Sequence, residues 1–332
     1  MSCCKTLHTI GGVELGDLGK IKATKALEWQ ARFGHRFSLV GLDVFRCDQL
    51  LFCRLLRELP ALRSLTVRQP SSCISSLTPV AQANALKCLS LYYSVEQNAD
   101  GSTQLDVAPL GACSSLQALN LSCGARGGGV RLSHLSALGG CSRLRTLELR
   151  NCLVDSEGVR GIASAGSAAA WSIETLRLQG CGVTSPLLLP FRALSKLSVL
   201  DLSLNSDLTS TQGLAECPRL QVLILTGCSN LSDVAPLAGC ARLHTLYLTA
   251  CSLALTDVSP LQACAELHTL HLNQCKRVSD ASALANCPKL KLLNLRCSGV
   301  DFDSAPYSVD GQLQVVFDTT ADPHRRQSVG VL

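Results

Sequence analysis

Cysteine is the residue type most able to do chemistry in this chain, which holds 19 cysteines among 332 residues. Thiols can coordinate zinc, act as nucleophiles or form disulfides. No two cysteines have the Cys-x-x-Cys spacing of a zinc site, and from Cys217 to Cys287 they recur at intervals of 11 to 13 residues. This regular series lacks the histidine partners of a structural zinc site and singles out no thiol for nucleophilic catalysis, so we interpret the cysteines as core residues.

Two other groups of residues could do chemistry. His244, His268 and His271 could bind a metal or sense pH, but the sequence places no carboxylate beside them to orient the imidazoles. The glycines between Gly124 and Gly129 lack the Gly-x-x-x-x-Gly-Lys-Ser/Thr order of a phosphate-binding loop. The sequence therefore predicts no enzyme, no cofactor and no metal site, and we interpret the histidines as exposed polar residues.

A repeat positions these residues. Ten segments follow the pattern Leu-x-x-Leu-x-Leu, and successive segments start 23 to 30 residues apart. They begin at Leu62, Leu86, Leu116, Leu144, Ile173, Leu197, Leu220, Leu243, Leu267 and Leu290. Leu223 and Leu225 stand two apart, which is strand spacing, so they share one face. Stacked copies predict a parallel sheet over a continuous leucine core, with the intervening residues on the opposite face.

The segments between the predicted strands also repeat. Asp106, Asp233 and Asp257 each begin an Asp-Val-x-Pro-Leu sequence. Proline ends an extended element and aspartate caps a short helical turn, so these segments predict tight 3₁₀ turns. Residues 155–170, which belong to a 29-residue repeat, predict a true helix with Ser156 and Glu157 at its start.

A cysteine often follows the last leucine by three residues. Cys152, Cys181, Cys228, Cys251 and Cys275 hold this place, and Asn205 holds it once. With these features the chain resembles the cysteine-containing class of leucine-rich repeat proteins, over roughly residues 37 to 318. The Asp-Val-Ser-Pro-Leu returns are similar to those of kinetoplastid leucine-rich repeat proteins. The resemblance implies an α/β solenoid, a leucine-rich repeat horseshoe with a parallel concave sheet, short 3₁₀ or turn segments on the convex side and one or two convex helices.

Three regions are expected along the chain. Residues 1–61 are predicted to form an N-terminal helical cap with a degenerate first repeat, including a helix capped by Asp48. Residues 62–318 are the predicted solenoid of about ten repeats plus a degraded closing repeat. Residues 319–332 are the predicted tail, in which Arg325-Arg-Gln-Ser328 resembles a kinase site that would add negative charge if phosphorylated.

Cysteine use also bears on location. The start of the chain, Met1-Ser-Cys-Cys, has no apolar signal region, and no stretch reaches the roughly 18 to 20 apolar residues that span a membrane. Free thiols that follow the repeat indicate a reducing intracellular compartment, with the cytoplasm or cytoskeleton favoured over an organelle. The net charge of +5 is too weak to indicate nucleic-acid binding by itself.

The predicted concave face changes along the chain. Early repeats have mixed charge with an excess of arginine, including Arg150 and Arg177, whereas the face from Val222 to Asn273 is nearly uncharged. Apolar and tyrosine side chains on such a face are typical of protein contacts. We therefore expect partner binding at Val222, Ile224, Tyr247, Thr249, His271 and Asn273, with Arg150 and Arg177, and loop contacts at Arg126 and Arg131.

These observations favour a non-catalytic protein–protein interaction scaffold, a structural subunit of a larger assembly. The family resemblance suggests a cytoskeletal or flagellar assembly. A ribonucleoprotein or ribosome-associated subunit is the first alternative, supported by the arginines, although acidic residues interrupt them and stacking aromatics are few. A ubiquitin-ligase substrate receptor is the second, although residues 1–61 contain no recognisable F-box.

Overall fold

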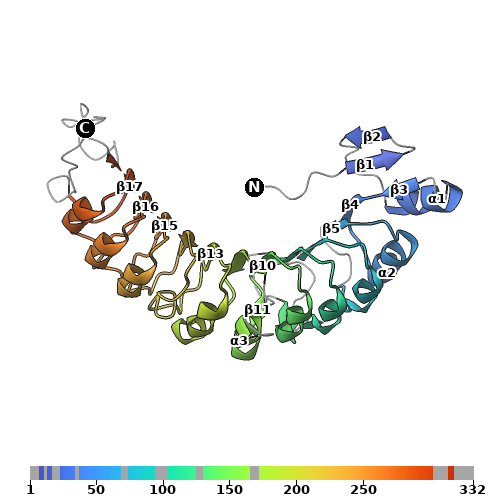
Figure 1. Cartoon of the computed structure of the whole chain (residues 1–332), viewed down its shortest axis with the longest axis horizontal. Coiled ribbons are helices and arrows are strands. Elements are labelled where there is room, and N and C mark those ends of the chain that lie inside the picture. Colours follow the sequence, from blue (N-terminus) through green and yellow to red (C-terminus); the bar gives the residue numbers. More distant parts are fainter. Residues whose placement is uncertain are drawn as a thin grey trace. The chain divides into compact units, whose positions relative to one another are not determined.

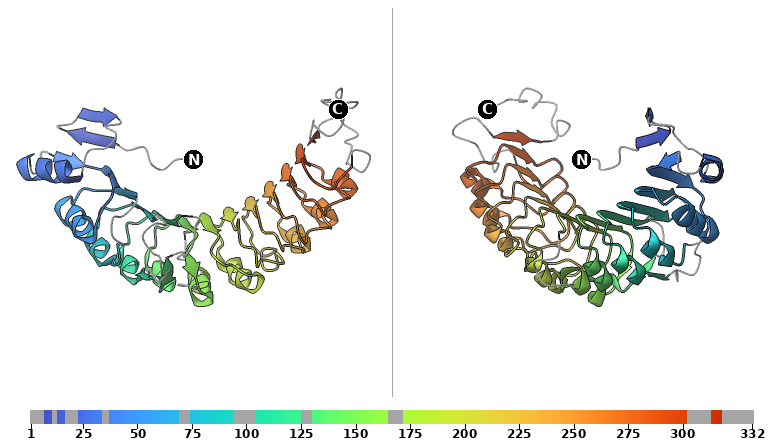
Figure 2. Two further views of the ribbon diagram at one scale, coloured as in Figure 1. Left: turned by 180° about the vertical axis from the view of Figure 1, so that it is seen from behind. Right: turned by 45° about the vertical axis from the view of Figure 1, so that its right-hand side comes forward.

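The computed structural model describes residues 7–10, 13–16, 23–33, 37–68, 74–93, 104–124, 130–164, 172–301 and 313–317 (Figure 1). The chain forms two compact units, unit 1 (Met1–Ile173) and unit 2 (Glu174–Leu332). In each unit a parallel sheet lies on one side and short helices lie on the other, as Figure 2 shows from two further directions. We call the exposed side of the sheet the strand face and the helical side the return side.

Unit 1 begins with an antiparallel sheet of β1 (Leu7–Ile10), β2 (Val13–Gly16) and β3 (Phe37–Leu39), beside helix α1 (Ala23–Phe33). Its parallel strands are β4 (Gly41–Phe45), β5 (Ser64–Arg68), β6 (Cys88–Tyr93), β8 (Ala118–Cys123) and β10 (Thr146–Arg150). The sequence predicted the helices of this region but missed the β1–β2 hairpin, because those residues carry no repeat leucines.

Helices and 3₁₀ helices form the return side of unit 1. They are α2 (Gln49–Glu58), η2 (Thr78–Gln82), η4 (Ala108–Ala112), η5 (Leu135–Gly140) and α3 (Ser156–Ser164). The predicted cap at Asp48 is confirmed, since its carboxylate accepts from the backbone N–H of Leu51 at 2.7 Å. At α3 the capping carboxylate belongs to Asp155, which accepts from Gly158 N–H at 2.7 Å.

A second small parallel sheet accompanies these turns and contains β7 (Gln104–Asp106), β9 (Arg131–Ser133) and β11 (Leu153–Val154). Leu105 and Leu132 lie side by side in it and are both buried. Arg131 therefore lies on a strand and not on the predicted loop, because the burial of Leu132 draws its neighbours into extended pairing. Arg126, Ser328 and the predicted tail, residues 319–332, lie outside the described residues.

Unit 2 has a shorter and more regular repeat. Its parallel strands are β12 (Thr175–Gln179), β13 (Val199–Asp201), β14 (Val222–Ile224), β15 (Thr245–Tyr247), β16 (Thr269–His271), β17 (Leu292–Asn294) and β18 (Gln314–Val316). Its return side consists of η6 (Ser185–Ala193), η7 (Ala235–Gly239), η8 (Ser259–Ala263) and η9 (Ser282–Asn286). The predicted 3₁₀ returns are confirmed.

The leucines of the repeat form the core of each unit. Leu223, Leu246, Leu270 and Leu293 occupy equivalent places in adjacent strands and are fully buried. Each strand is too short to bury its leucines alone, so stability comes from neighbouring repeats. The aspartates at the start of the 3₁₀ turns accept from the second following backbone N–H, at 2.8 to 3.0 Å; they are Asp106, Asp233, Asp257 and Asp280. The bond from the Ala108 N–H lowers the pKa of the Asp106 carboxyl, and hydrogen bonds from the side chain and then the backbone N–H of Ser282 lower that of Asp280.

Candidate interaction surface

The strand face of unit 2 aligns its side chains in straight rows. Ile224 pairs with Tyr247, Tyr247 with His271 and His271 with Asn294, so four successive repeats contribute to one row. Val222 lies in the parallel row with Thr245 and Thr269. These positions are half-buried, since their neighbours cover the sides of each side chain and leave the tip accessible. The predicted alignment of Ile224, Tyr247 and His271 is confirmed.

Tyr247 and His271 stack face to face. Their ring centroids are 4.6 Å apart and their planes differ by 4°. Burial lowers the pKa of His271, so the imidazole is neutral near neutral pH. The two rings beside Ile224 make a flat, uncharged surface of the kind that hydrophobic and aromatic side chains bind.

Polar side chains border this surface on one side. Thr249 donates its hydroxyl hydrogen to Asn273 Oδ1 at 2.8 Å. The hydrogen bond fixes both side chains across two repeats and leaves the amide NH₂ group of Asn273 as a possible donor to a partner. Thr249 and Asn273 thus lie where the sequence predicts them, beside the stacked rings.

The row ends differently toward β13. Asp201 and Ser203, which alternation alone predicts to be exposed, are buried. Asp201 Oδ1 accepts from the Ser203 backbone N–H at 2.9 Å and from the Ser203 hydroxyl at 2.5 Å. The carboxylate is therefore engaged within its own strand and offers a partner little of its charge.

The histidines at the start of the strands have a carboxylate beside them, contrary to the sequence-based interpretation. His244 and His268 stack with ring centroids 5.2 Å apart, and His244 Nε2 lies 3.9 Å from Glu266 Oε2. Each Nδ1 donates to a backbone carbonyl, that of Arg242 and of Glu266 respectively. Glu266 also pairs with Lys289 at 2.5 Å. The spacing did not reveal Glu266 because it reaches the His244 imidazole from the following repeat, at the turn before β16.

The predicted arginines are spread over both units. Arg150 ends β10 in unit 1 and is exposed, while Arg177 lies in β12 of unit 2 and is half-buried. Arg68 is held by Asp43 at 3.0 Å and lies over the Tyr92 ring. This exposed pair partly offsets one of the positive charges that the RNA-binding alternative needs.

The thiols form two hydrogen-bonded ladders that the sequence did not reveal. In the strand-exit ladder each thiol donates to the carbonyl of the last strand leucine in the preceding repeat, at 2.9 to 3.3 Å; its members are Cys152, Cys228, Cys251 and Cys275. In the return ladder each thiol donates to a backbone carbonyl on the return side of the preceding repeat. The acceptor lies in a 3₁₀ helix, except for Leu214, which accepts from Cys240. The members of this ladder are Cys113, Cys141, Cys240, Cys264 and Cys287. The cysteines therefore bond adjacent repeats as well as filling the core.

Burial in these ladders disfavours the thiolate. It raises the pKa of Cys240 and Cys264 to about 12, and that of Cys228 and Cys275 to about 11. Cys123 is the exception in unit 1, because its sulfur lies 3.9 Å from the Cys152 sulfur and this hydrogen-bond contact lowers the pKa of Cys123. Thiols that stay protonated suit a structural role and not nucleophilic catalysis.

Asn205 replaces cysteine in the strand-exit ladder and makes more bonds than a thiol can. Its Nδ2 donates to the carbonyls of Leu178 and Leu202 at 2.8 and 2.7 Å. Its Oδ1 accepts from the backbone N–H groups of Cys181 and Val183 at 3.1 and 2.9 Å. The amide, only 1% exposed, therefore bonds the strand exit of its own repeat, at Leu202, to the strand exit of the preceding repeat.

Other kinds of site find little support in the described residues. They contain no group of three or more His, Cys, Asp or Glu side chains that could hold a metal ion. No helix among them is both long and apolar enough to cross a membrane. An open pocket of about 710 Å³ on the return side of unit 1, between α2 and η2, is lined mainly by apolar and amide side chains, with Arg57 as its charged residue. It lacks the converging polar groups of a small-molecule site.

Comparison with known proteins identifies the fold. No family model and no curated protein matches the sequence. Among solved structures, an internalin from Listeria monocytogenes is 22% identical with a TM-score of 0.58, over 79% of this chain and 69% of that one. The leucine-rich repeat domain of APL1 is 20% identical with a TM-score of 0.50, over 83% of this chain and 71% of that one. The predicted fold class is confirmed, and the chain is a leucine-rich repeat protein by fold.

Proposed function

We propose that this protein is a non-catalytic interaction scaffold that binds a partner protein through the strand face of unit 2. The observation that carries the proposal is the row of Ile224, Tyr247 and His271, where an aliphatic side chain adjoins two stacked rings on a nearly uncharged face. Threonine, valine, isoleucine and tyrosine are all common in strands, but strand propensity does not account for two stacked rings beside an aliphatic side chain. Tyrosine and apolar side chains in such a setting are typical of interface hot spots.

The proposal includes a structural place in a larger assembly within a reducing compartment. The resemblance of the Asp-Val-Ser-Pro-Leu returns to kinetoplastid repeats supports a cytoskeletal or flagellar assembly. The two thiol ladders support a reducing environment, because their hydrogen bonds need protonated thiols. The ribonucleoprotein alternative is weakened by the Arg68–Asp43 pair.

The test compares two variants in cells of the source organism. Tagged wild-type protein, the double variant Ile224→Ala with Tyr247→Ala, and the control Thr66→Ala with Ser90→Ala on the strand face of unit 1 are purified at low and high salt. We expect the first variant to recover at least tenfold less partner than wild type, since truncation of each hot-spot side chain typically costs more than about 1 kcal/mol of binding free energy. Circular dichroism and thermal unfolding establish that all three chains are folded.

Equal partner recovery from both variants would refute a binding role for this face. Cytoskeletal proteins that survive high salt would support the proposed assembly. Ribosomal or RNA-processing proteins that are released by nuclease or salt would instead favour the ribonucleoprotein alternative.

A further inference from the structure

Over β14 to β17 of unit 2, the described residues of the strand face include positive but no negative side chains. Backbone hydrogen bonds extend the rows beyond the named strands, so that Lys291 follows His268 and His244 at the start of the strands, and Arg296 follows Asn273 at their end. The face consists of Gln221, Val222, Ile224 and Thr226; His244, Thr245, Tyr247 and Thr249; His268, Thr269, His271 and Asn273; and Lys291, Leu292, Asn294 and Arg296. None of these residues is acidic.

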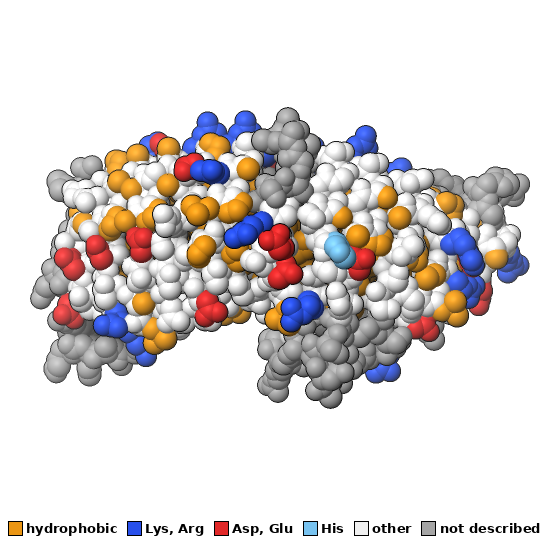
Figure 3. Space-filling view, turned by 90° about the horizontal axis from the view of Figure 1, so that it is seen from below, with side chains coloured by type: hydrophobic (Ala, Val, Ile, Leu, Met, Phe, Trp, Pro, Cys, Tyr) orange, Lys and Arg blue, Asp and Glu red, His pale blue; other side chains and the backbone are white. Residues whose placement is uncertain are grey.

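The carboxylates of the same repeats are used elsewhere. Asp233, Asp257 and Asp280 accept from backbone N–H groups at the 3₁₀ turns. Figure 3 looks at the return side, where acidic side chains recur along the repeats. Glu266 lies next to His244 but is neutralised by Lys289 at 2.5 Å. Among the described residues, the separation of acids from the strand face therefore leaves Lys291 and Arg296 with no carboxylate on the face over β14 to β17.

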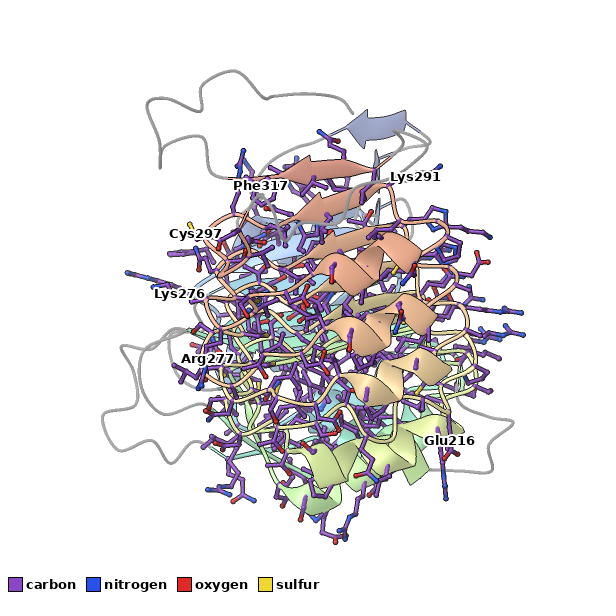
Figure 4. The ribbon with its side chains drawn as sticks, turned by 90° about the vertical axis from the view of Figure 1, so that its left-hand side faces the viewer. Glu216, Lys276, Arg277, Lys291, Cys297 and Phe317 are labelled. Atoms are coloured by element: carbon purple, nitrogen blue, oxygen red, sulfur yellow. The ribbon has the colours of Figure 1, made fainter. Side chains whose placement is uncertain are left out.

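The two cations lie on opposite margins of the flat surface. In Figure 4, which looks toward the C-terminal end of unit 2, Lys291 lies at one side of the sheet, whereas Cys297, which follows Arg296, lies at the other. Both cations are exposed. Between them lie Tyr247 and His271 in their stack and Asn294, whose amide is 3.5 Å from His271 Nδ1. An uncharged centre is thus bordered by positive charge on both margins.

We propose that this face binds an extended acidic segment of a partner protein, which places an apolar or aromatic side chain against Ile224, Tyr247 and His271 and carboxylates beside Lys291 and Arg296. The inference rests on the proposed function and adds the chemistry of the partner. Charge complementarity of this kind speeds association and fixes the register of the bound segment. Burial of an aromatic side chain at the centre supplies most of the affinity.

The geometry favours a protein segment over single-stranded nucleic acid. A nucleic-acid groove needs a run of cations along the backbone path and several exposed ring faces on which bases stack. Here two cations lie on the face, and Tyr247 turns one ring face toward His271. Nucleic acid is accordingly the competing outcome of the test.

The test selects ligands from a displayed library of random peptides, with the full-length protein as bait. Selected peptides are then measured by fluorescence anisotropy against wild type, against Lys291→Glu with Arg296→Glu, and against Ile224→Ala with Tyr247→Ala. A matched charge control is Arg57→Glu with Arg160→Glu, on the exposed surfaces of α2 and α3 in unit 1. A labelled uridine oligonucleotide is the nucleic-acid probe.

We expect the selected peptides to be enriched in Asp and Glu around an aromatic or large aliphatic residue. Charge reversal at Lys291 and Arg296 should weaken their binding more than tenfold at low salt and much less at high salt, because exposed charges are screened. The Ile224 and Tyr247 truncations should weaken binding at both salt concentrations. The charge control should bind as wild type does.

The outcomes separate the two proposals. Peptides without acidic enrichment that still need Ile224 and Tyr247 would overturn the acidic partner and leave the interaction face in place. Failure to select any peptide that depends on Ile224 and Tyr247 would overturn both. Tight binding of the oligonucleotide that is lost on charge reversal at Lys291 and Arg296 would assign the cations to nucleic acid and overturn the acidic partner.

Discussion

Raising the pH should unfold unit 2 before unit 1, because unit 2 holds most of the thiols that burial keeps protonated. Seven thiols of unit 2 have raised pKa values: Cys217, Cys228, Cys240, Cys251, Cys264, Cys275 and Cys287. Among the described residues of unit 1, three thiols have raised pKa values: Cys47, Cys113 and Cys141. In the unfolded chain all of them ionise near the ordinary thiol value of 9.0.

The magnitude follows from proton linkage. Below about pH 9 the folded and unfolded chains both keep these protons, and stability is fully present. Between about pH 9 and the raised pKa values of about 11 to 12, only the unfolded chain releases them, so stability falls by up to about 1.4 kcal/mol per pH unit for each thiol. At about pH 10 the seven thiols of unit 2 lower the free energy of unfolding by on the order of 10 kcal/mol, and the three thiols of unit 1 lower it by about 4 kcal/mol. The larger loss is comparable with the whole stability of a typical domain.

The assay is urea unfolding followed by circular dichroism at a series of pH values under a reducing agent. Thiol-labelling with peptide mass spectrometry assigns each opened cysteine to its unit. The double variant Cys240→Ala with Cys264→Ala removes two thiols of pKa about 12, so it should reduce the pH slope by about 2.7 kcal/mol per unit. An unfolding free energy that is flat from about pH 9 to 10, or a slope unchanged in the double variant, would refute this reasoning.

Two further predictions concern the turns at the strand exits. Asn205→Ala should lower the free energy of unfolding by about 3 kcal/mol or more, because the buried backbone groups of Leu178, Cys181 and Val183 lose their bonds. Asn205→Cys should recover only part of this loss, because a thiol cannot accept from both N–H groups. Equal stability of the cysteine variant and wild type in urea titrations would contradict the role of the amide. Ala250 has a φ of 60°, which is strained for a residue with a side chain. Ala250→Gly should therefore raise the melting temperature, with a net gain in unfolding free energy of about 0.5 to 1 kcal/mol after the entropy cost of glycine. A destabilised glycine variant would show that the left-handed turn stores no strain.

The spacing of leucines predicted much of the fold and of the surface. Leu223, Leu246 and Leu270 fix which face of each strand is buried, and a common period then aligns Ile224 with Tyr247 and His271. The period says nothing of how neighbouring side chains rotate, so the parallel stack of Tyr247 and His271 could not be predicted. Sequence alternation likewise misplaced Asp201, because its hydrogen bonds with Ser203 depend on three-dimensional contact.

Interactions between repeats were the least predictable. A cysteine at a regular position reads as a small apolar residue, and only the structure shows that Cys228 and Cys251 donate to the carbonyls of Leu202 and Leu225. Glu266 was missed as a neighbour of His244 because the two residues belong to different repeats. The residues that depart from the leucine pattern, at the N-terminal hairpin and in β9, were predicted less well since no period constrained them.

The thiol ladders have a consequence for how this chain can change length. Each strand-exit thiol donates to the repeat before it, and the bond has the same form at Cys228, Cys251 and Cys275. In a duplicated segment running from Cys228 to the residue before Cys251, the thiol would therefore donate to a carbonyl of the preceding repeat. The same segment would offer its own carbonyl to the thiol of the following repeat. Gene duplication could lengthen unit 2 by whole repeats without new core chemistry, whereas the repeat of Asn205, whose amide needs the backbone groups of Leu178, Cys181 and Val183 in the preceding repeat, would resist being copied.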